Sequence, residues 1–379
     1  MKRIITRTLA AGAVATLALA GLTACSDDNG GGGSDAGSGG GSASGTVGVS
    51  MPTQTSERWI FDGNNTRQGL EDAGFEVNLQ FANDDIPTQQ QQIDQMITQG
   101  VDVLIIASID GTALGTQLEA AAAAGIPVIS YDRLIRDTEN IDFYVTFDNF
   151  QVGVDQATSL ISGLETHFAG VSPWYVELFA GSLDDNNAHF FWDGAMSVLQ
   201  PRIDDGSIVV GSGQTTIEQG ATMRWSQEAA QTRMENLITA HYGGGSGALH
   251  GVLSPFDGIS RGIITALQNA GYGPTLADGL PVVTGQDAEV ASVSMIDQGI
   301  QYSTIFKDTR LLAEQAVAAA VSFANGETPT PNNTTDYDNG VFVVPSFLLP
   351  VSIVNIDNIV VELVDTGFLT EEQIAAGVM

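Results

Sequence analysis

The chain has 379 residues, of which 45 are acidic and only 13 are basic, so its formal net charge is -32. A chain this negative repels phosphate backbones and anionic lipid. This argues against a protein that binds nucleic acid, or that binds a membrane surface through basic residues. Hydrophobic residues make up 43% of the chain, which argues against intrinsic disorder and predicts one large domain or two ordinary ones.

The first 24 residues have the pattern of a bacterial secretion signal. Three bases, Lys2, Arg3 and Arg7, precede an apolar run that is short for a membrane span and ends Leu-Thr-Ala before Cys25. This ending resembles a lipobox, so we expect residues 1–24 to be a lipoprotein signal peptide and Cys25 to carry the lipid. The alternative is an ordinary secretory signal with an incidental cysteine. Cys25 is the only cysteine, which excludes a disulfide within the chain.

Residues 25–45 are rich in Gly, Ser and Asp, a composition typical of a flexible tether. Signal and tether together predict an extracytoplasmic protein that is lipid-anchored to the outer face of the cell membrane. Removing the signal takes three bases from 13 and leaves ten, nine of them Arg. The tenth is Lys307, the single lysine of the expected mature chain.

From Thr46 onward, apolar runs typical of strands alternate with helical patterns. The expected strands lie at 46–51, 75–81, 101–108, 126–131, 143–147, 174–180, 207–211, 248–254, 280–285 and 302–306. Helical patterns include 57–73, 87–99, 112–124, 150–164, 226–241, 258–270 and 308–325. This alternation predicts an α/β fold of parallel sheets covered by helices on both faces. Ten strands are too many for one compact sheet. We therefore expect two α/β lobes.

Two aspartates follow the ends of short apolar strands. Asp132 ends the stretch 103–132 and Asp287 ends 251–287, and both stretches run strand, Asp-Gly turn, helix, Ala-Gly, strand. The similarity of the two stretches indicates two related lobes. The alternative is that any βαβ unit has this pattern. In open α/β sheets, ligands bind outside the carboxyl ends of strands, which points to both aspartates.

Metal and cofactor motifs are absent from the sequence. No glycine motif for a phosphate or a dinucleotide follows a strand, and GxSxG is missing. The four histidines lack metal-ligand spacing, and the DDNN stretch at 184–187 lacks the alternating acids of a calcium loop. We therefore expect neither a metal nor a cofactor.

Several polar residues stand where a cleft between lobes would lie. Arg58-Trp59 follows the first strand, Asp132-Arg133 follows another, and Asp257 comes soon after a third. Their structural alternatives are a helix start capped by Thr55 or Ser56 and a surface ion pair. Planar charged side chains can each bond two adjacent sugar hydroxyls, and an aromatic ring can cover the C–H face of a pyranose. The set is therefore typical of a sugar site.

At this point the sequence resembles the periplasmic sugar-binding proteins of ABC transporters, of the type I (ribose/xylose-binding-like) class. The resemblance is strongest to its xylose-binding and multiple-monosaccharide-binding subgroup, and it covers nearly all of 46–379. It is carried by MPTQTSERW (51–59), the run 83–111, IPVISYDRLI (126–135), YVTFDNFQVG (144–153), GSLDDNNA (181–188), LSPFDG (253–258), VVTGQDAE (282–289), YSTIFKD (302–308) and VPSFLLP (344–350).

The resemblance implies a substrate-binding set between two Rossmann-like lobes joined by a three-segment hinge. Matched motif by motif, the set is Arg58, Trp59, Asp132, Arg133, Asn187, Gln214, Asp257, Asp287 and Lys307. The motif around Gln214 matches only loosely. The xylose-binding pattern has Asn before the Asp of SPFD, where this chain has Phe256. That departure favours the multiple-sugar subgroup.

The chain path of the family implies hinge crossings near 146–149, 285–287 and 345–350. The N-terminal lobe would then be 46–147 plus 287–345, and the C-terminal lobe 148–286 plus 346–379. We expect a monomer that captures a monosaccharide, such as xylose, glucose, galactose or arabinose, and delivers it to an ABC permease. The alternatives are a sugar-sensing co-receptor for chemotaxis or signalling and, more remotely, an enzyme acting on sugars through paired carboxylates.

Overall fold

The computed structural model describes residues 45–245 and 248–378. The expected signal peptide, Cys25 and almost all of the tether lie outside the described residues. The described residues belong to one compact folded unit. Within the described part, none of the helices combines the length and the apolar character needed to cross a membrane.

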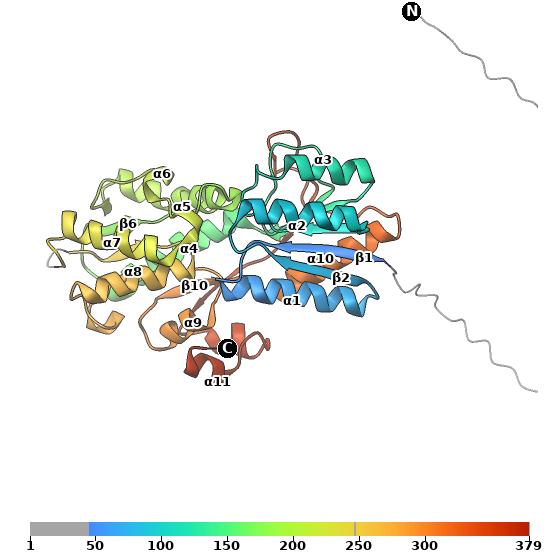
Figure 1. The fold of residues 1–379 in the computed structure, drawn as a ribbon. Helices are drawn as coiled ribbons and strands as arrows, with labels where there is room; N and C mark the ends of the chain where they lie inside the picture. The colour runs from blue at the N-terminus through green and yellow to red at the C-terminus, as the bar shows by residue number, and fades with distance from the viewer. Residues whose placement is uncertain (1–44, 246–247, 379) are drawn as a thin grey trace, which may run out of the picture. The chain divides into compact units, whose positions relative to one another are not determined.

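The first lobe is built on a six-stranded parallel sheet of order β11-β5-β4-β3-β1-β2, which lies on the right in Figure 1. Its strands are β1 (Thr46–Met51), β2 (Glu76–Phe81), β3 (Val103–Ile106), β4 (Val128–Tyr131), β5 (Phe143–Phe147) and β11 (Ser346–Leu349). Its helices are α1 (Glu57–Asp72), α2 (Ile86–Gln99), α3 (Gly115–Ala124) and α10 (Thr309–Ala324). Apolar clusters cover both faces of the sheet, which explains why β3, β4 and β5 and nearly all of β1 are buried.

The second lobe contains a four-stranded parallel sheet of order β7-β6-β8-β9. Its strands are β6 (Trp174–Leu178), β7 (Ile208–Val210), β8 (Gly251–Leu253) and β9 (Val282–Val283). Its helices are α4 (Asn149–His167), α5 (Asn186–Asp204), α6 (Ile217–Gly220), α7 (Gln227–His241), α8 (Asp257–Asn269), α9 (Val290–Asp297) and α11 (Glu371–Ala376). Short helical turns lie at Met223–Trp225 and Leu276–Asp278, and a π-helix at Val360–Val364. Two apolar clusters again enclose the sheet.

Local sequence signals set several element ends. The Asp85 carboxylate accepts a hydrogen bond from the Thr88 N–H and so caps the start of α2. The helices α2 and α3 end at Gly100 and Gly125, whose φ angles of 75° and 73° suit glycine best.

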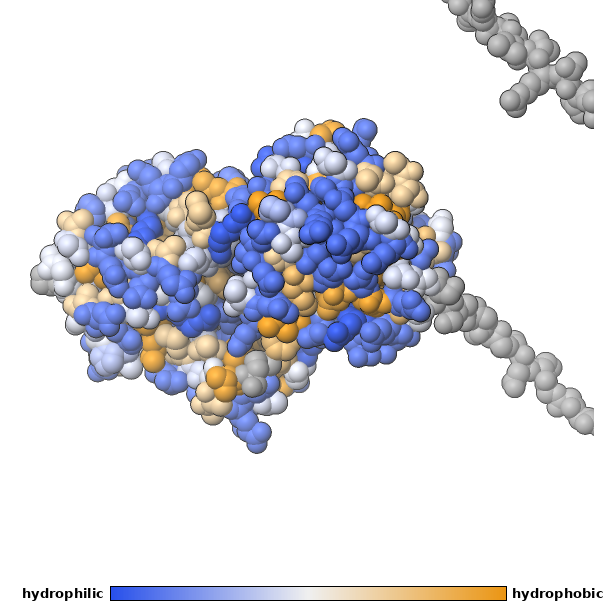
Figure 2. Space-filling view, in the orientation of Figure 1, coloured by the Kyte–Doolittle hydropathy of each residue, from blue (hydrophilic) through white to orange (hydrophobic). Residues whose placement is uncertain are grey.

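Side chains seen from one face are largely hydrophilic, with hydrophobic residues scattered among them (Figure 2).

The chain crosses between the lobes at three places, and the second differs from expectation. Strands β10 (Ser303–Phe306) and β12 (Ser352–Asn355) pair with each other. Strand β10 also continues the second sheet, because Tyr302 and Ile305 donate backbone hydrogen bonds to the carbonyls of Val283 and Gly285. Residues 287–306 therefore stay with the second lobe, and the chain crosses after Phe306 rather than at 285–287.

The third crossing lies between β11 and β12. Strand β11 pairs with β5 of the first lobe, so the start of the expected segment 346–379 belongs to the first lobe. Helix α10 packs against α1, which also places 309–324 in the first lobe. The first crossing, between β5 and α4, lies within the expected 146–149. The lobe boundaries are thus 46–147 plus 309–349, and 149–306 plus 352–378.

Candidate functional site

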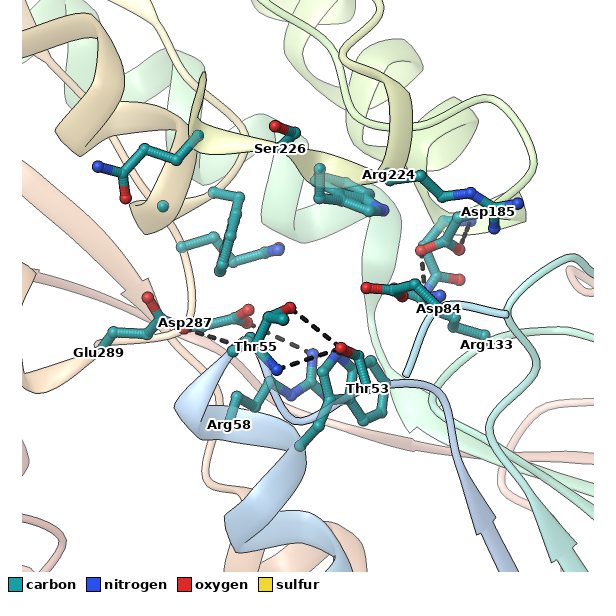
Figure 3. A pocket seen from close by; sticks show the side chains of 18 of the residues that line it. Thr53, Thr55, Arg58, Asp84, Arg133, Asp185, Arg224, Ser226, Asp287 and Glu289 are labelled. Carbon is teal, nitrogen blue, oxygen red and sulfur yellow. Dashed lines mark hydrogen bonds and ion pairs between the residues drawn. The ribbon is translucent and has the colours of Figure 1, made fainter. Parts of the chain in front are cut away.

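A cleft of about 380 Å³ lies between the two lobes and is lined by residues of both (Figure 3). Loops at the carboxyl ends of the strands supply most of its walls. Of the nine expected residues, seven line it: Arg58, Trp59, Asp132, Arg133, Asn187, Asp287 and Lys307.

Arg58 is the centre of a buried charged network. It lies in the first turn of α1, and its Nε donates to the Oδ2 of Asp62, one helical turn later, at 3.0 Å. Its Nη2 donates to Asp132 of the first lobe, and its Nη1 lies 3.5 Å from Asp287 Oδ1 of the second. The Lys307 ammonium contacts the same Asp287 oxygen at 2.8 Å. Two cations and two carboxylates from both lobes therefore meet at one wall of the cleft.

Burial and charge act in opposite directions on these groups. Burial disfavours the charged guanidinium, but the carboxylates of Asp132, Asp287 and Asp62 raise the pKa of Arg58 well above its usual value. Burial also acts to raise the pKa of Asp132, yet Arg58 and Lys307 together hold it below its usual value. Asp62 is different, because burial outweighs Arg58 and raises its pKa to about 6. Asp132 is thus held ionised as a hydrogen-bond acceptor.

Backbone geometry directs Asp132 and Asp287 toward the cleft. Both adopt left-handed conformations, with φ of 59° and 93°, which are uncommon for residues other than glycine. The Asp132 carbonyl accepts hydrogen bonds from the Tyr144 hydroxyl at 2.6 Å and the Asn187 amide at 2.8 Å. The amide oxygen of Asn187 in turn accepts from Tyr144 and from Asn149. Asn187 therefore links the second lobe to the Asp132 loop.

Two arginines lie against the indole ring of Trp59. The guanidinium carbons of Arg58 and Arg133 lie 4.8 Å and 5.0 Å from the ring centroid, within cation–π range. Arg133 also pairs with Asp185 of the second lobe, with 3.1 Å between Nε and Oδ2. Both charged neighbours hold the mostly buried ring in place at the edge of the cleft.

The structure places two expected residues outside the lining. Asp257 is fully buried behind Phe256 and Gly258, where it accepts hydrogen bonds from the Glu289 N–H, the Gln301 amide and the Thr304 hydroxyl. Its carboxylate oxygens therefore join segments of the second lobe to one another. The carbonyl oxygen of Gln214 accepts from Arg233 at 2.7 Å, which turns this side chain away from the cleft.

The cleft also contains residues that the sequence did not single out. Trp225 forms part of the wall of the second lobe, and nothing in its flanking sequence indicated this. Glu289 accepts a hydrogen bond from the Ser56 hydroxyl at 2.7 Å and pairs with Arg261 at 2.6 Å. The sequence indicates Ser56 only as a possible helix cap, yet its side chain makes no cap bond. The GQDAE motif contains Glu289 and was the signal that pointed nearest to it.

No metal site is evident. Among residues 45–245 and 248–378, no three His, Cys, Asp or Glu side chains are grouped so that they could hold an ion. Five acidic lining residues are instead paired with Arg or Lys: Asp132, Asp184, Asp185, Asp287 and Glu289.

Comparison with known proteins gives consistent matches. Residues 47–328 match the family model described as periplasmic binding protein domain. The chain is 51% identical over 330 residues to the multiple sugar-binding periplasmic receptor ChvE of Rhizobium radiobacter, covering 87% of this chain and 92% of that one. It is 35% identical to the D-xylose-binding periplasmic protein of Escherichia coli, covering 86% and 92%.

A solved structure shares both fold and sequence. An ABC transporter solute-binding protein from Clostridium phytofermentans, with bound beta-D-glucose, aligns with a TM-score of 0.82 at 42% identity. The alignment covers 87% of this chain and 99% of that one.

Proposed function

Because this chain belongs to the periplasmic binding protein domain family, we propose that it captures a monosaccharide between its two lobes for an ABC transporter. The observation that carries the proposal is the meeting of Arg58, Asp132 and Asp287, from both lobes, at one wall of the cleft. The names of the relatives support sugar as the ligand class. Glucose in a structure that is 42% identical supports an aldose of that size.

The residues suit a neutral sugar chemically. Each hydroxyl both donates and accepts, so it can donate to a carboxylate and accept from a guanidinium or ammonium. Asp132, Asp287, Arg58, Arg133 and Lys307 supply these partners in paired form. The aromatic residues of the lining, Trp59 and Trp225, supply apolar contact for the C–H groups of the sugar ring. A ligand that contacts both lobes favours the closed arrangement, and a permease would recognise that arrangement.

A second candidate is a sensing role that uses the same cleft. One relative is named a receptor, which favours a co-receptor for chemotaxis or signalling as an addition to transport. Turnover of the sugar finds less support. Asp132 and Asp287 are each held by buried cations, and the relatives named for sugars are binding proteins. Sugar binding for transport is therefore better supported than catalysis.

Lipid anchoring at Cys25 is part of the proposal and rests on the sequence alone. An anchor followed by the tether 25–45 would keep the folded unit at the outer face of the membrane. We also propose that the protein works as a monomer, because both walls of the cleft come from one chain.

A thermal-shift screen over monosaccharides, followed by calorimetry, tests the function. Binding to the folded state alone raises the melting temperature. Asp132→Asn removes a charged acceptor, so we expect affinity for D-glucose or its best competitor to fall about 10–100-fold. Asp72→Asn, at the exposed end of α1, is the matched control and should bind as the wild type does. Absence of binding to any sugar, or full affinity in Asp132→Asn, would overturn the proposal.

A further inference from the structure

The loop that carries Trp225 is tied to the end of strand β6. Ala180 and Ala221 form a parallel bridge, and the Thr222 N–H donates to the Gly181 carbonyl at 3.1 Å. The Arg224 N–H donates to the Ser182 hydroxyl at 2.8 Å. These bonds fix the loop directly over residues 180–182.

The backbone then turns the Trp225 ring back over the strand end. Arg224 and Trp225 both have φ of 55°, two successive left-handed residues that the tied loop must hold in place. The ring meets Phe191 edge-on at 6.3 Å and Phe256 at 6.2 Å between centroids. Its indole N–H is buried and has no hydrogen-bond partner among the described residues. The two phenylalanines therefore pack against the ring, and all three residues line the cleft.

Gly181 lies directly behind this ring. A Cβ placed on Gly181 would come within 2.0 Å of Trp225 Cη2 and 2.4 Å of Cζ2. The backbone of Gly181 is outside the left-handed region, so an alanine is compatible with the local conformation. The absence of a side chain at 181 is thus needed for the ring and not for the turn.

We propose that Gly181 is a specificity-determining residue. Because it has no side chain, the Trp225 ring can lie close to its backbone and leaves more room in the cleft. The inference rests on the proposed sugar-binding function. A Cβ at 181 would overlap the indole, so a side chain there must displace the ring. Because Phe191 and Phe256 pack against the ring and the ring lines the cleft, we expect it to move toward the cleft. We expect the space that Gly181 leaves to admit a hexose as well as a pentose.

The test compares two aldoses that differ by one hydroxymethyl group, D-glucose and D-xylose, by calorimetry. Gly181→Ala narrows the cleft, so it should weaken glucose more than xylose. We expect the ratio of glucose to xylose affinity to fall about 10-fold or more, the usual effect of one carbon in a filled pocket. Gly115→Ala is the matched control, because a Cβ there meets nothing within 4 Å. It should leave the ratio unchanged.

A double variant separates steric pressure from a general structural effect. Trp225→Phe removes the outer ring atoms that a Cβ at 181 would strike. In that background, Gly181→Ala should no longer change the ratio. If Gly181→Ala alone does not fold, Trp225→Phe is the alternative test. The smaller ring enlarges the cleft at the same place, so the ratio of glucose to xylose affinity of this variant should rise.

Several outcomes would overturn the inference. They are a glucose-to-xylose ratio unchanged by Gly181→Ala, an equal loss for both sugars, and a shift that persists in the Trp225→Phe background. Failure of the proposed function is distinguishable from these, since the wild-type protein would then bind neither sugar.

Discussion

At the scale of single residues, Arg58 has the most demanding surroundings. Its guanidinium lies within hydrogen-bond reach of three carboxylates, and its side chain is only 5% exposed. Asp62 in turn accepts from the buried Tyr131 hydroxyl. The ligand wall is therefore the outer part of a buried ionic network that extends into the core of the first lobe.

Removing Arg58 should cost stability as well as binding. Arg58→Ala leaves Asp62, Asp132 and Asp287 without their shared partner, and breaking a buried pair costs about 3–5 kcal/mol. We expect a loss of that size in the free energy of unfolding, measured by urea denaturation without ligand. Arg67→Ala, exposed on the same helix, should change it by less than about 0.5 kcal/mol. Equal stability of the two variants would contradict the network.

At the scale of elements, Asp257 joins three segments of the second lobe. It begins α8, and its carboxylate accepts from the Glu289 N–H before α9 and from the Thr304 hydroxyl in β10. Burial raises its pKa to about 8, and the nearby Glu289 acts in the same direction. The carboxyl therefore keeps its proton in the folded protein at pH values where the unfolded chain has lost it.

This difference predicts how stability depends on pH. The native state binds one more proton than the unfolded state between pH of about 4 and 8, so Asp257 stabilises fully below that window. Its contribution is lost as pH rises through the window. Asp257→Asn should remove a slope of up to about 1.4 kcal/mol per pH unit from the free energy of unfolding. Urea titrations from pH 4 to 8 check this, and parallel curves for variant and wild type would refute it.

Sequence patterns predicted elements well and long-range contacts poorly. The helix pattern 57–73 and the strand-end aspartates Asp132 and Asp287 were visible, because apolar periodicity and strand ends are local features. The pairing of β10 with β12 joins distant segments, so the second crossing was misplaced. Trp225 was missed for the same reason, since its contact with Gly181 arises only in the fold.

At the scale of the whole folded unit, the lobes touch through a bond outside the Arg58 network. The Ser56 hydroxyl of the first lobe donates to Glu289 of the second, and Arg261 holds that carboxylate. Because Ser56 makes no cap bond to α1, its hydroxyl is free for this contact. The pair is suited to hold the closed arrangement.

Ser56→Ala should therefore speed opening. Hydrogen bonds to charged groups contribute about 1.5–3 kcal/mol, so the dissociation rate of glucose should rise about 10-fold or more. The association rate should stay near that of the wild type, because the open form is not altered. Stopped-flow fluorescence measures both rates. Ser322→Ala, whose hydroxyl bonds within α10, is the control, and an unchanged dissociation rate in Ser56→Ala would contradict the role.

The burial of Lys307 has a practical consequence for chemistry on this protein. Lys307 is the only lysine after residue 24. Its side chain is 1% exposed and forms an ion pair with Asp287. Amine-directed reagents, whether biotin esters, fluorescent dyes or cross-linkers, therefore find no accessible side-chain target on the closed folded unit. Acylation at this one position becomes a reporter of lobe opening, and a saturating ligand should protect it.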